Sequence, residues 1–335
     1  QLRESTKKRL GPAELGRLLT KHIFGVDIDD DACQIAELSL SLTLLEYVNP
    51  PDLTETSFQL PSLRDHNIFR AHAFDNESRW YREGRKQPFD WIVGNPPWKE
   101  LKPQDLDDTD KLAWSWMTKT RLEYPVGGNQ LAEAFAWLAS EVLAGDGVAA
   151  LLLPAMTLFK YESTGFRKSF FLKMRLWSVA NFANLSDVLF SGRATLPAAS
   201  FFYSRNGGLG MERLDGNPVE VYSPFRGNQP ASQGESERRR KQTWNIVVNA
   251  SDLREIPYRD IIDGNSLTWK ISMWGSHIDV TVLRNVARHF RSIGDLERDG
   301  VIAIAQGPEL RAFEHARRDP TERHSELAGR VTVDV

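Results

Sequence analysis

The stretch that decides the fold is FDWIVGNPPW, residues 89–98. Residues 89–94 form a short apolar run of the kind found in a buried strand, and they lead directly into Asn95-Pro96-Pro97-Trp98. In an open α/β sheet, ligands bind beyond the carboxyl ends of the strands. Two consecutive prolines fix φ and remove two backbone donors. The stretch therefore predicts a stiff binding loop at the end of a buried strand.

This loop has the chemistry to hold a planar base that carries an amine. The side-chain oxygen of Asn95 and the carbonyl oxygen of Pro96 can both accept hydrogen bonds from one NH₂ group. The ring of Trp98 offers a stacking face for the base. The same four residues could instead be an ordinary turn with a packed tryptophan, but the strand before them favours a binding loop.

The rest of the chain alternates predicted strands and helices, which is typical of βαβ units around a mostly parallel sheet. The polar stretch 99–128 is either a loop that closes over a bound base or an ordinary insertion. In chain order we expect a strand ending in acids at 22–29, a helix at 32–45, a short strand at 67–74, the strand 89–94, a helix at 131–142, a strand at 148–153, a helix near 162–175, and strands at 178–182 and 198–203.

These features resemble the N6-adenine DNA methyltransferases of the large type IIG restriction–modification and BREX phage-defence kind. That family has Asn, Asp or Ser, then Pro-Pro and an aromatic residue, at the end of a strand, as residues 95–98 do here. The acidic strand Ile23–Asp29 and its following helix are similar to the family's motif II, and the resemblance covers about residues 20–205. It implies an α/β fold with the Rossmann-like sheet of class I S-adenosylmethionine-dependent methyltransferases.

The resemblance also implies the site and its ligands. S-adenosylmethionine would be the cofactor, double-stranded DNA the partner, and the N6 amine of a flipped-out adenine the methyl acceptor. Asn95, Pro96, Pro97 and Trp98 would form the catalytic loop, in which Trp98 stacks on the base. Asp27 would accept the ribose hydroxyls of the cofactor, although a plain helix cap or loop acid is its alternative reading.

His72 stands where the family usually has an aspartate that contacts the adenine amine of the cofactor. A neutral imidazole can accept a hydrogen bond through one ring nitrogen. Three readings are open for this position: His72 replaces the aspartate, the cofactor is held less well, or the strand aligns differently.

The glycine-rich motif I of the family is not found upstream of the motif II strand Ile23–Asp29, where only Gly11 and Gly16 occur. The resemblance then implies that motif I precedes Gln1, that the first strand of the sheet is missing, and that residues 1–335 alone are inactive. The strand-like ending Arg330–Val335 also suggests a fragment.

The alternation of predicted strands and helices stops near residue 206, where a polar segment begins, and this change suggests a division into domains. We predict a catalytic domain at 1–206, a linker at 207–243, and the start of a mixed α/β DNA target-recognition domain at 244–335, with a helical run at 278–290. The charge run 235–241 is either a solvated linker or a phosphate contact.

Composition excludes several classes of protein. The 42 basic and 45 acidic residues give a net charge of -3, so a uniformly basic nucleic-acid coat is excluded. The single cysteine, Cys33, excludes an intramolecular disulfide, indicates a reducing, cytoplasmic setting, and argues against cytosine C5 chemistry, which needs a thiolate. No apolar run approaches the ~18 residues of a membrane span. We expect no metal site.

Three other functions remain open. An attached nuclease at Asp90, Glu100 and Lys102 is disfavoured because the two carboxylates should lie about a strand's length apart. A non-catalytic DNA-binding specificity subunit with a decayed methyltransferase domain would explain His72 and the missing motif, but residues 95–98 oppose it. An RNA methyltransferase, or one acting on protein glutamine, uses a similar motif, yet the segment 244–335 favours DNA. Restriction or phage-defence subunits would be further partners.

Overall fold

A computed structural model describes residues 10–49, 53, 59–189, 196–208, 210, 214, 216–226, 246–247, 253–274 and 277–302. The chain divides into two compact units, Gln1–Ser276 and His277–Val335. The second unit contains helices α11 (His277–His289) and α12 (Ile293–Arg298). No described helix is both long enough and apolar enough to span a membrane.

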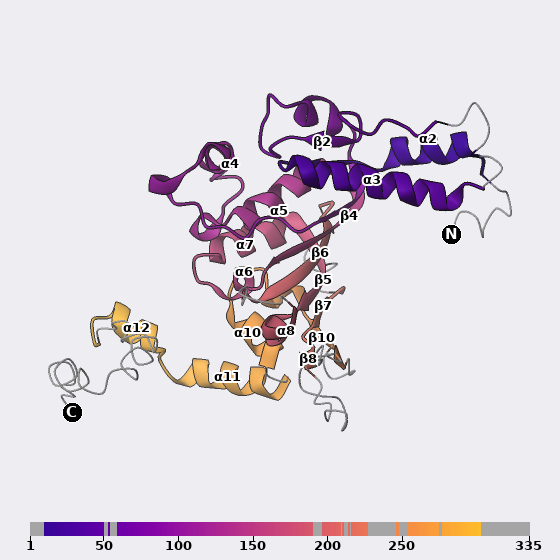
Figure 1. Cartoon of the computed structure of the whole chain (residues 1–335). Helices are drawn as coiled ribbons and strands as arrows, with labels where there is room; N and C mark the ends of the chain where they lie inside the picture. The colour runs from indigo at the N-terminus through magenta and orange to yellow at the C-terminus, as the bar shows by residue number, and fades with distance from the viewer. Residues whose placement is uncertain are drawn as a thin grey trace, which may run out of the picture. The chain divides into compact units, whose positions relative to one another are not determined.

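The main sheet has six strands in the order β10-β7-β5-β6-β4-β3 (Figure 1). Strand β3 runs parallel to β4, and β5 runs parallel to β7. Strand β6 runs antiparallel to both β4 and β5, and β10 runs antiparallel to β7. The bounds are β3 (Phe89–Gly94), β4 (Leu143–Pro154), β5 (Met174–Asn181), β6 (Ala198–Arg205), β7 (Val219–Tyr222) and β10 (Leu253–Ile256).

The α/β class is confirmed, but the expectation of a mostly parallel sheet is wrong, because the sheet is mixed. A parallel return needs a crossover, usually a full helix. The described part of the connection between β5 and β6 holds only the short turns η5 (Ala183–Leu185) and α8 (Ser186–Leu189). Strand β6 therefore returns antiparallel, beside β5.

A separate pair of parallel strands, β1 (Gly25–Asp27) and β2 (Ile68–Arg70), carries the acidic motif. Among the described strands, β1 pairs only with β2, and β3 pairs only with β4. The rings of Phe24 and Phe89 lie 5.7 Å apart and bring the starts of β1 and β3 together. The sheet is thus interrupted between β1 and β3. A third small pair consists of β8 (Phe225–Arg226) and β9 (Ile246–Val247).

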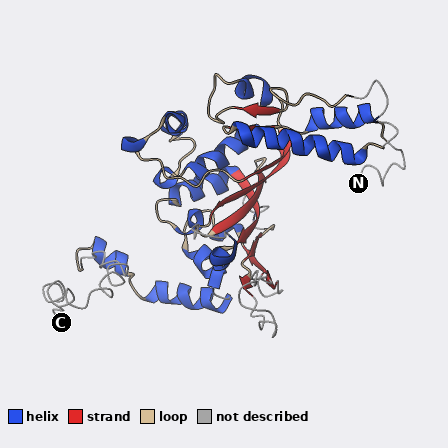
Figure 2. Ribbon diagram, viewed as in Figure 1, coloured by secondary structure: helices blue, strands red, loops and turns tan. Residues whose placement is uncertain are grey.

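The core lies on one face of the main sheet, where helices α5 and α7 pack against β4 and β5 (Figure 2). Trp137, Phe170 and Tyr203 are fully buried there. On the opposite face, the side chains of Trp91 and Val93 are 72% and 79% exposed. The longer helices of this unit are α2 (Pro12–His22), α3 (Asp30–Tyr47), α4 (Asp108–Thr120), α5 (Leu131–Val142), α7 (Thr164–Lys173) and α10 (Leu267–Trp274). The short turns are η2 (Trp80–Gly84), η3 (Pro103–Asp105), η4 (Gly127–Asn129), α6 (Met156–Phe159) and η7 (Tyr258–Asp260).

Residues beyond 244 contribute to the core of the first unit. Strand β10 extends the main sheet, and Tyr258 and Trp269 are fully buried in its core. The Tyr258 hydroxyl accepts from the Leu176 amide at 3.0 Å. The first compact unit extends to Ser276, and the division into a catalytic domain at 1–206, a linker at 207–243 and a further domain from 244 stays a prediction. The charge run 235–241 lies outside the described residues, and a DNA target-recognition role for residues 244–335 stays a prediction.

Candidate functional site

The loop of residues 95–98 leaves the carboxyl end of β3, as the sequence predicts. Asn95 and Pro97 are exposed, Pro96 is buried, and Trp98 is half-buried. The indole Nε1–H of Trp98 donates to the Leu152 carbonyl of β4 at 3.2 Å, and the ring packs against the main core. The loop is therefore stiffened by two prolines and also anchored to the neighbouring strand.

The chain that follows the loop is held against the start of α5. The Leu131 amide donates to the Lys99 carbonyl at 2.8 Å, and the Leu101 amide donates to the Asn129 carbonyl at 3.0 Å. Glu100 and Gln130 face each other across this short antiparallel bridge. These bonds fix where the loop ends. No three His, Cys, Asp or Glu side chains form a group suited to a metal ion in the part of the chain that the structure describes.

The segment 99–128 contains a helix that the sequence reading missed. Asp107 caps α4 by accepting from the Asp110 amide, and Ala113 and Met117 bury their side chains against α5. Lys99, the residue after Trp98, places its Nζ 2.5 Å from the buried Asp110 carboxylate. Hydrogen bonds from the Thr109 hydroxyl and the Asp110 amide lower the pKa of Asp107 to about 2. An ion pair therefore joins α4 to the end of the candidate catalytic loop.

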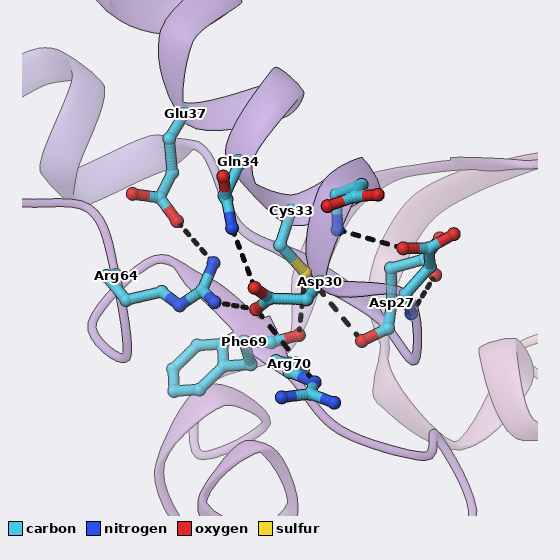
Figure 3. Close-up of polar contacts among 10 residues, drawn as sticks. Asp27, Asp30, Cys33, Gln34, Glu37, Arg64, Phe69 and Arg70 are labelled. Carbon is cyan, nitrogen blue, oxygen red and sulfur yellow. Dashed lines mark hydrogen bonds and ion pairs between the residues drawn. The ribbon is translucent and has the colours of Figure 1, made fainter.

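Asp27 lies exposed at the carboxyl end of β1 (Figure 3). Its Oδ1 accepts from the Asp29 amide at 2.8 Å. Asp29, and not Asp27, caps α3 by accepting from the Asp31 amide. Asp30 binds Arg64 and Gln34, whose hydrogen bonds lower the pKa of Asp30. The alternative reading of Asp27 as the cap of this helix is thus wrong, because Asp29 has that role.

His72 lies two residues past the end of β2 and directly follows Ala71. The Ala71 amide donates to the Asp27 carbonyl at 2.9 Å, which joins the two strand ends. The Phe74 amide donates to His72 Nδ1 at 3.3 Å. Burial lowers the pKa of His72, against the opposing influence of nearby carboxylates, so the ring is neutral near pH 7. The proton of the neutral ring is then on Nε2, which donates rather than accepts.

Ring contacts connect these strand ends to α4 and α5. The ring of Phe74 lies 5.1 Å from that of Trp116 and 4.9 Å from that of Phe135.

Cys33 is buried beside Asp27, with Sγ 3.8 Å from the Asp27 carbonyl oxygen, and burial raises the pKa of the thiol. A buried neutral thiol is unsuited to nucleophilic attack, in line with the argument against cytosine C5 chemistry.

Glu133, which the sequence reading did not select, is fully buried in the first turn of α5. Its Oε2 accepts from the Gly127 amide at 2.7 Å. Burial raises the pKa of Glu133 to about 7, although Ser163, the Gly127 amide, Thr157 and Arg167 act in the opposite direction. A carboxylate inside the apolar run LAEAFAW, residues 131–137, was the available signal.

A family model described as the Eco57I restriction-modification methylase matches residues 21–189, just over half of the chain. No curated protein matches the chain. The chain is similar to the DNA-bound Type ISP restriction-modification enzyme LlaBIII, with 13% identity, a TM-score of 0.47, and coverage of 66% of this chain and 16% of that one. A Type ISP enzyme, LlaGI, gives 15% identity, a TM-score of 0.48, and coverage of 66% and 20%.

A type I restriction-modification methyltransferase subunit from Streptococcus thermophilus is also similar, with 17% identity and a TM-score of 0.38. The similarity covers 60% of this chain and 36% of that one. The chain thus spans about a fifth or less of the two Type ISP enzymes and about a third of this subunit.

Proposed function

This chain belongs to the Eco57I restriction-modification methylase family, and from that premise we propose that it transfers a methyl group to the N6 amine of adenine in DNA. The observation that carries the proposal is the loop of residues 95–98. It places the exposed Asn95 side chain beyond the end of β3, on a support of two prolines and one anchored tryptophan. This rigidity suits a group that must hold an amine in one orientation.

The chain's own residues would act on the amine of a base rotated out of the DNA stack. The Asn95 side-chain oxygen and the Pro96 carbonyl accept its two hydrogens, which favours a tetrahedral nitrogen with its lone pair free. That lone pair would form the new N–C bond as the methyl group's bond to the sulfonium sulfur breaks and its electron pair stays on sulfur, and the nitrogen would then lose one proton to water. Trp98 stacks on the base with a ring whose orientation its bond to Leu152 restricts.

The residues present fit S-adenosylmethionine at its adenosine end. Asp27 Oδ1 accepts from a backbone amide, whereas Oδ2 has no hydrogen-bond partner among the described residues and can accept a ribose hydroxyl. His72 would donate from Nε2 to a ring nitrogen of the cofactor's adenine, which replaces the expected contact with the adenine amine. When bound, the cofactor supplies the electrophilic methyl group.

The proposal is tested with the complete encoded protein, duplex DNA and tritiated S-adenosylmethionine. Asn95→Ala should lower methyl transfer by about 100-fold or more, as the loss of one well-placed polar group does in other enzymes, while DNA binding survives. Asn76→Ala, which removes another exposed asparagine, is the matched control. Mass spectrometry of the digested DNA should find N6-methyladenine. N4-methylcytosine would contradict the choice of base, and DNA binding without any transfer would support the non-catalytic specificity subunit.

A further inference from the structure

The turn η4 next to the candidate catalytic loop has a conformation that needs support. Gly128 and Asn129 have φ values of 54° and 53°, in the left-handed region that a non-glycine residue rarely adopts. Gly127 packs directly on the chain between α6 and α7, where a Cβ atom would lie 2.4 Å from the Ser163 Cα. The turn is therefore strained and has no room to shift toward that chain.

The Glu133 carboxyl group provides that support from inside the protein. Its Oε2 accepts from the Gly127 amide at 2.7 Å, at the first residue of the turn. Arg167 directs its own donors to the carbonyl oxygens of Gly264, Thr157 and Lys160 and to a threonine hydroxyl, so it acts on Glu133 through its charge. The fully buried carboxyl group therefore holds this turn through the hydrogen bond from the Gly127 amide.

The turn in turn holds the end of the candidate catalytic loop. Asn129 accepts from the Leu101 amide, and Leu131, at the start of α5, donates to the Lys99 carbonyl. Lys99 follows Trp98 directly. Two backbone hydrogen bonds thus connect the turn that Glu133 supports, and the start of α5, to the segment that follows the loop of residues 95–98.

We propose that Glu133 is a positioning residue: by holding the Gly127–Asn129 turn, its buried carboxyl group fixes the segment Lys99–Leu101 and with it the loop of residues 95–98. The consequence for methyl transfer rests on the proposed function, whereas the structural coupling does not. Glu133 touches no reacting group and acts only through the turn.

The charge on Glu133 sets the direction of a pH effect. Its pKa in the folded chain, about 7, lies above its ordinary value of 4.5, so folding favours the protonated form. Opening of the turn, which hydrates the carboxyl group, becomes easier as the pH rises from about 4.5 to 7. The charged group facing Glu133 is Arg167, and its polar neighbours are Ser163, Thr157 and the Gly127 amide.

The test is hydrogen exchange of the full chain at pH 5.5 and 7.5, read by mass spectrometry and corrected for the intrinsic exchange rate. In the wild type, peptides covering 97–101 and 127–131 should lose about 20-fold in protection between these values, as linkage predicts for the two pKa values. Glu133→Gln should remove this pH dependence, because an amide keeps the acceptor for Gly127 but does not titrate. Glu141→Gln, on the same helix, is the matched control.

Gly127→Ala supplies a second, uncharged test. The added methyl group must displace the turn, so exchange at 97–101 and 127–131 should rise while peptides from β5 and β6 stay unchanged. The proposal is overturned if Glu133→Gln leaves the pH dependence at 97–101 intact, or if every region responds equally. If exchange behaves as expected but the wild type transfers no methyl group, the positioning role stands and the proposed function fails.

Discussion

Glu133→Gln should stabilise the protein at alkaline pH. The pKa of this carboxyl group is raised from 4.5 to about 7 in the folded chain, so its ionisation costs stability that an amide does not lose. A difference of about 2.5 pKa units corresponds to about 3 kcal/mol at 1.36 kcal/mol per unit, as an upper figure. The cost is absent below pH 4.5, grows as the pH rises, and is complete above pH 7.

The glutamine also fits the site. Its carbonyl oxygen can accept from the Gly127 amide, as Oε2 does now. The Oε1 atom of Glu133 is buried beside the Ser163 hydroxyl group, and a glutamine NH₂ at the Oε1 position could donate to the Ser163 oxygen. The substitution should therefore cost little in packing.

Urea denaturation at pH 5 and pH 8 measures the effect. The free energy of unfolding of Glu133→Gln should exceed that of the wild type by about 3 kcal/mol at pH 8 and by less than about 1 kcal/mol at pH 5. Glu141 lies on the same helix as Glu133 and forms an ion pair with Arg85. Glu141→Gln should show no such pH-dependent gain. Equal destabilisation of Glu133→Gln at both pH values would show that folding does not favour the protonated form of Glu133, because the ionised carboxylate would then be stabilised by its surroundings.

Three further predictions concern the candidate site. Trp98→Ala should reduce the fluorescence of 2-aminopurine at the target position, because about 1–3 kcal/mol of base stacking is lost, while the overall affinity for duplex DNA changes little. Lost affinity with an unchanged fluorescence signal would instead indicate that Trp98 is needed for folding. Asp27→Ala should weaken S-adenosylmethionine binding by about 10-fold in titration calorimetry, as expected for hydrogen bonds to a charged group, and Asp31→Ala should not. Lys99→Met should lower the free energy of unfolding by about 1–3 kcal/mol, because it leaves the buried Asp110 carboxylate unpaired. Adding Asp110→Asn should restore part of that loss, and additive losses in the double variant would contradict the pairing.

Local pattern was sufficient for the elements that carry the candidate site. The run 89–94 forms β3 as expected, and the loop of residues 95–98 follows its carboxyl end. The acidic residues after β1 begin α3, with Asp29 as its cap. These features depend on hydrophobic runs, on prolines and on short-range hydrogen bonds, and such interactions are contained within a few residues of sequence.

The helix α4 shows where local pattern is insufficient. Its sequence is rich in aspartate at the start and reads as a polar loop, yet Ala113 and Met117 are buried because α5 and Phe74 offer an apolar surface for one face. The tautomer of His72 likewise depends on the Phe74 amide, whose position follows from the bend after β2.

Strand β3, the stiff loop after it and the acidic turn after β1 can be predicted from the sequence, because each is specified by neighbouring residues. The antiparallel insertion of β6 between β4 and β5, the anchoring of Trp98 to Leu152, and the burial of Glu133 under the Gly127 turn depend on the folded structure. In each of these, the partners meet across the packed core. The free energy of burial and hydrogen bonding there comes from contacts between segments that are distant in the sequence.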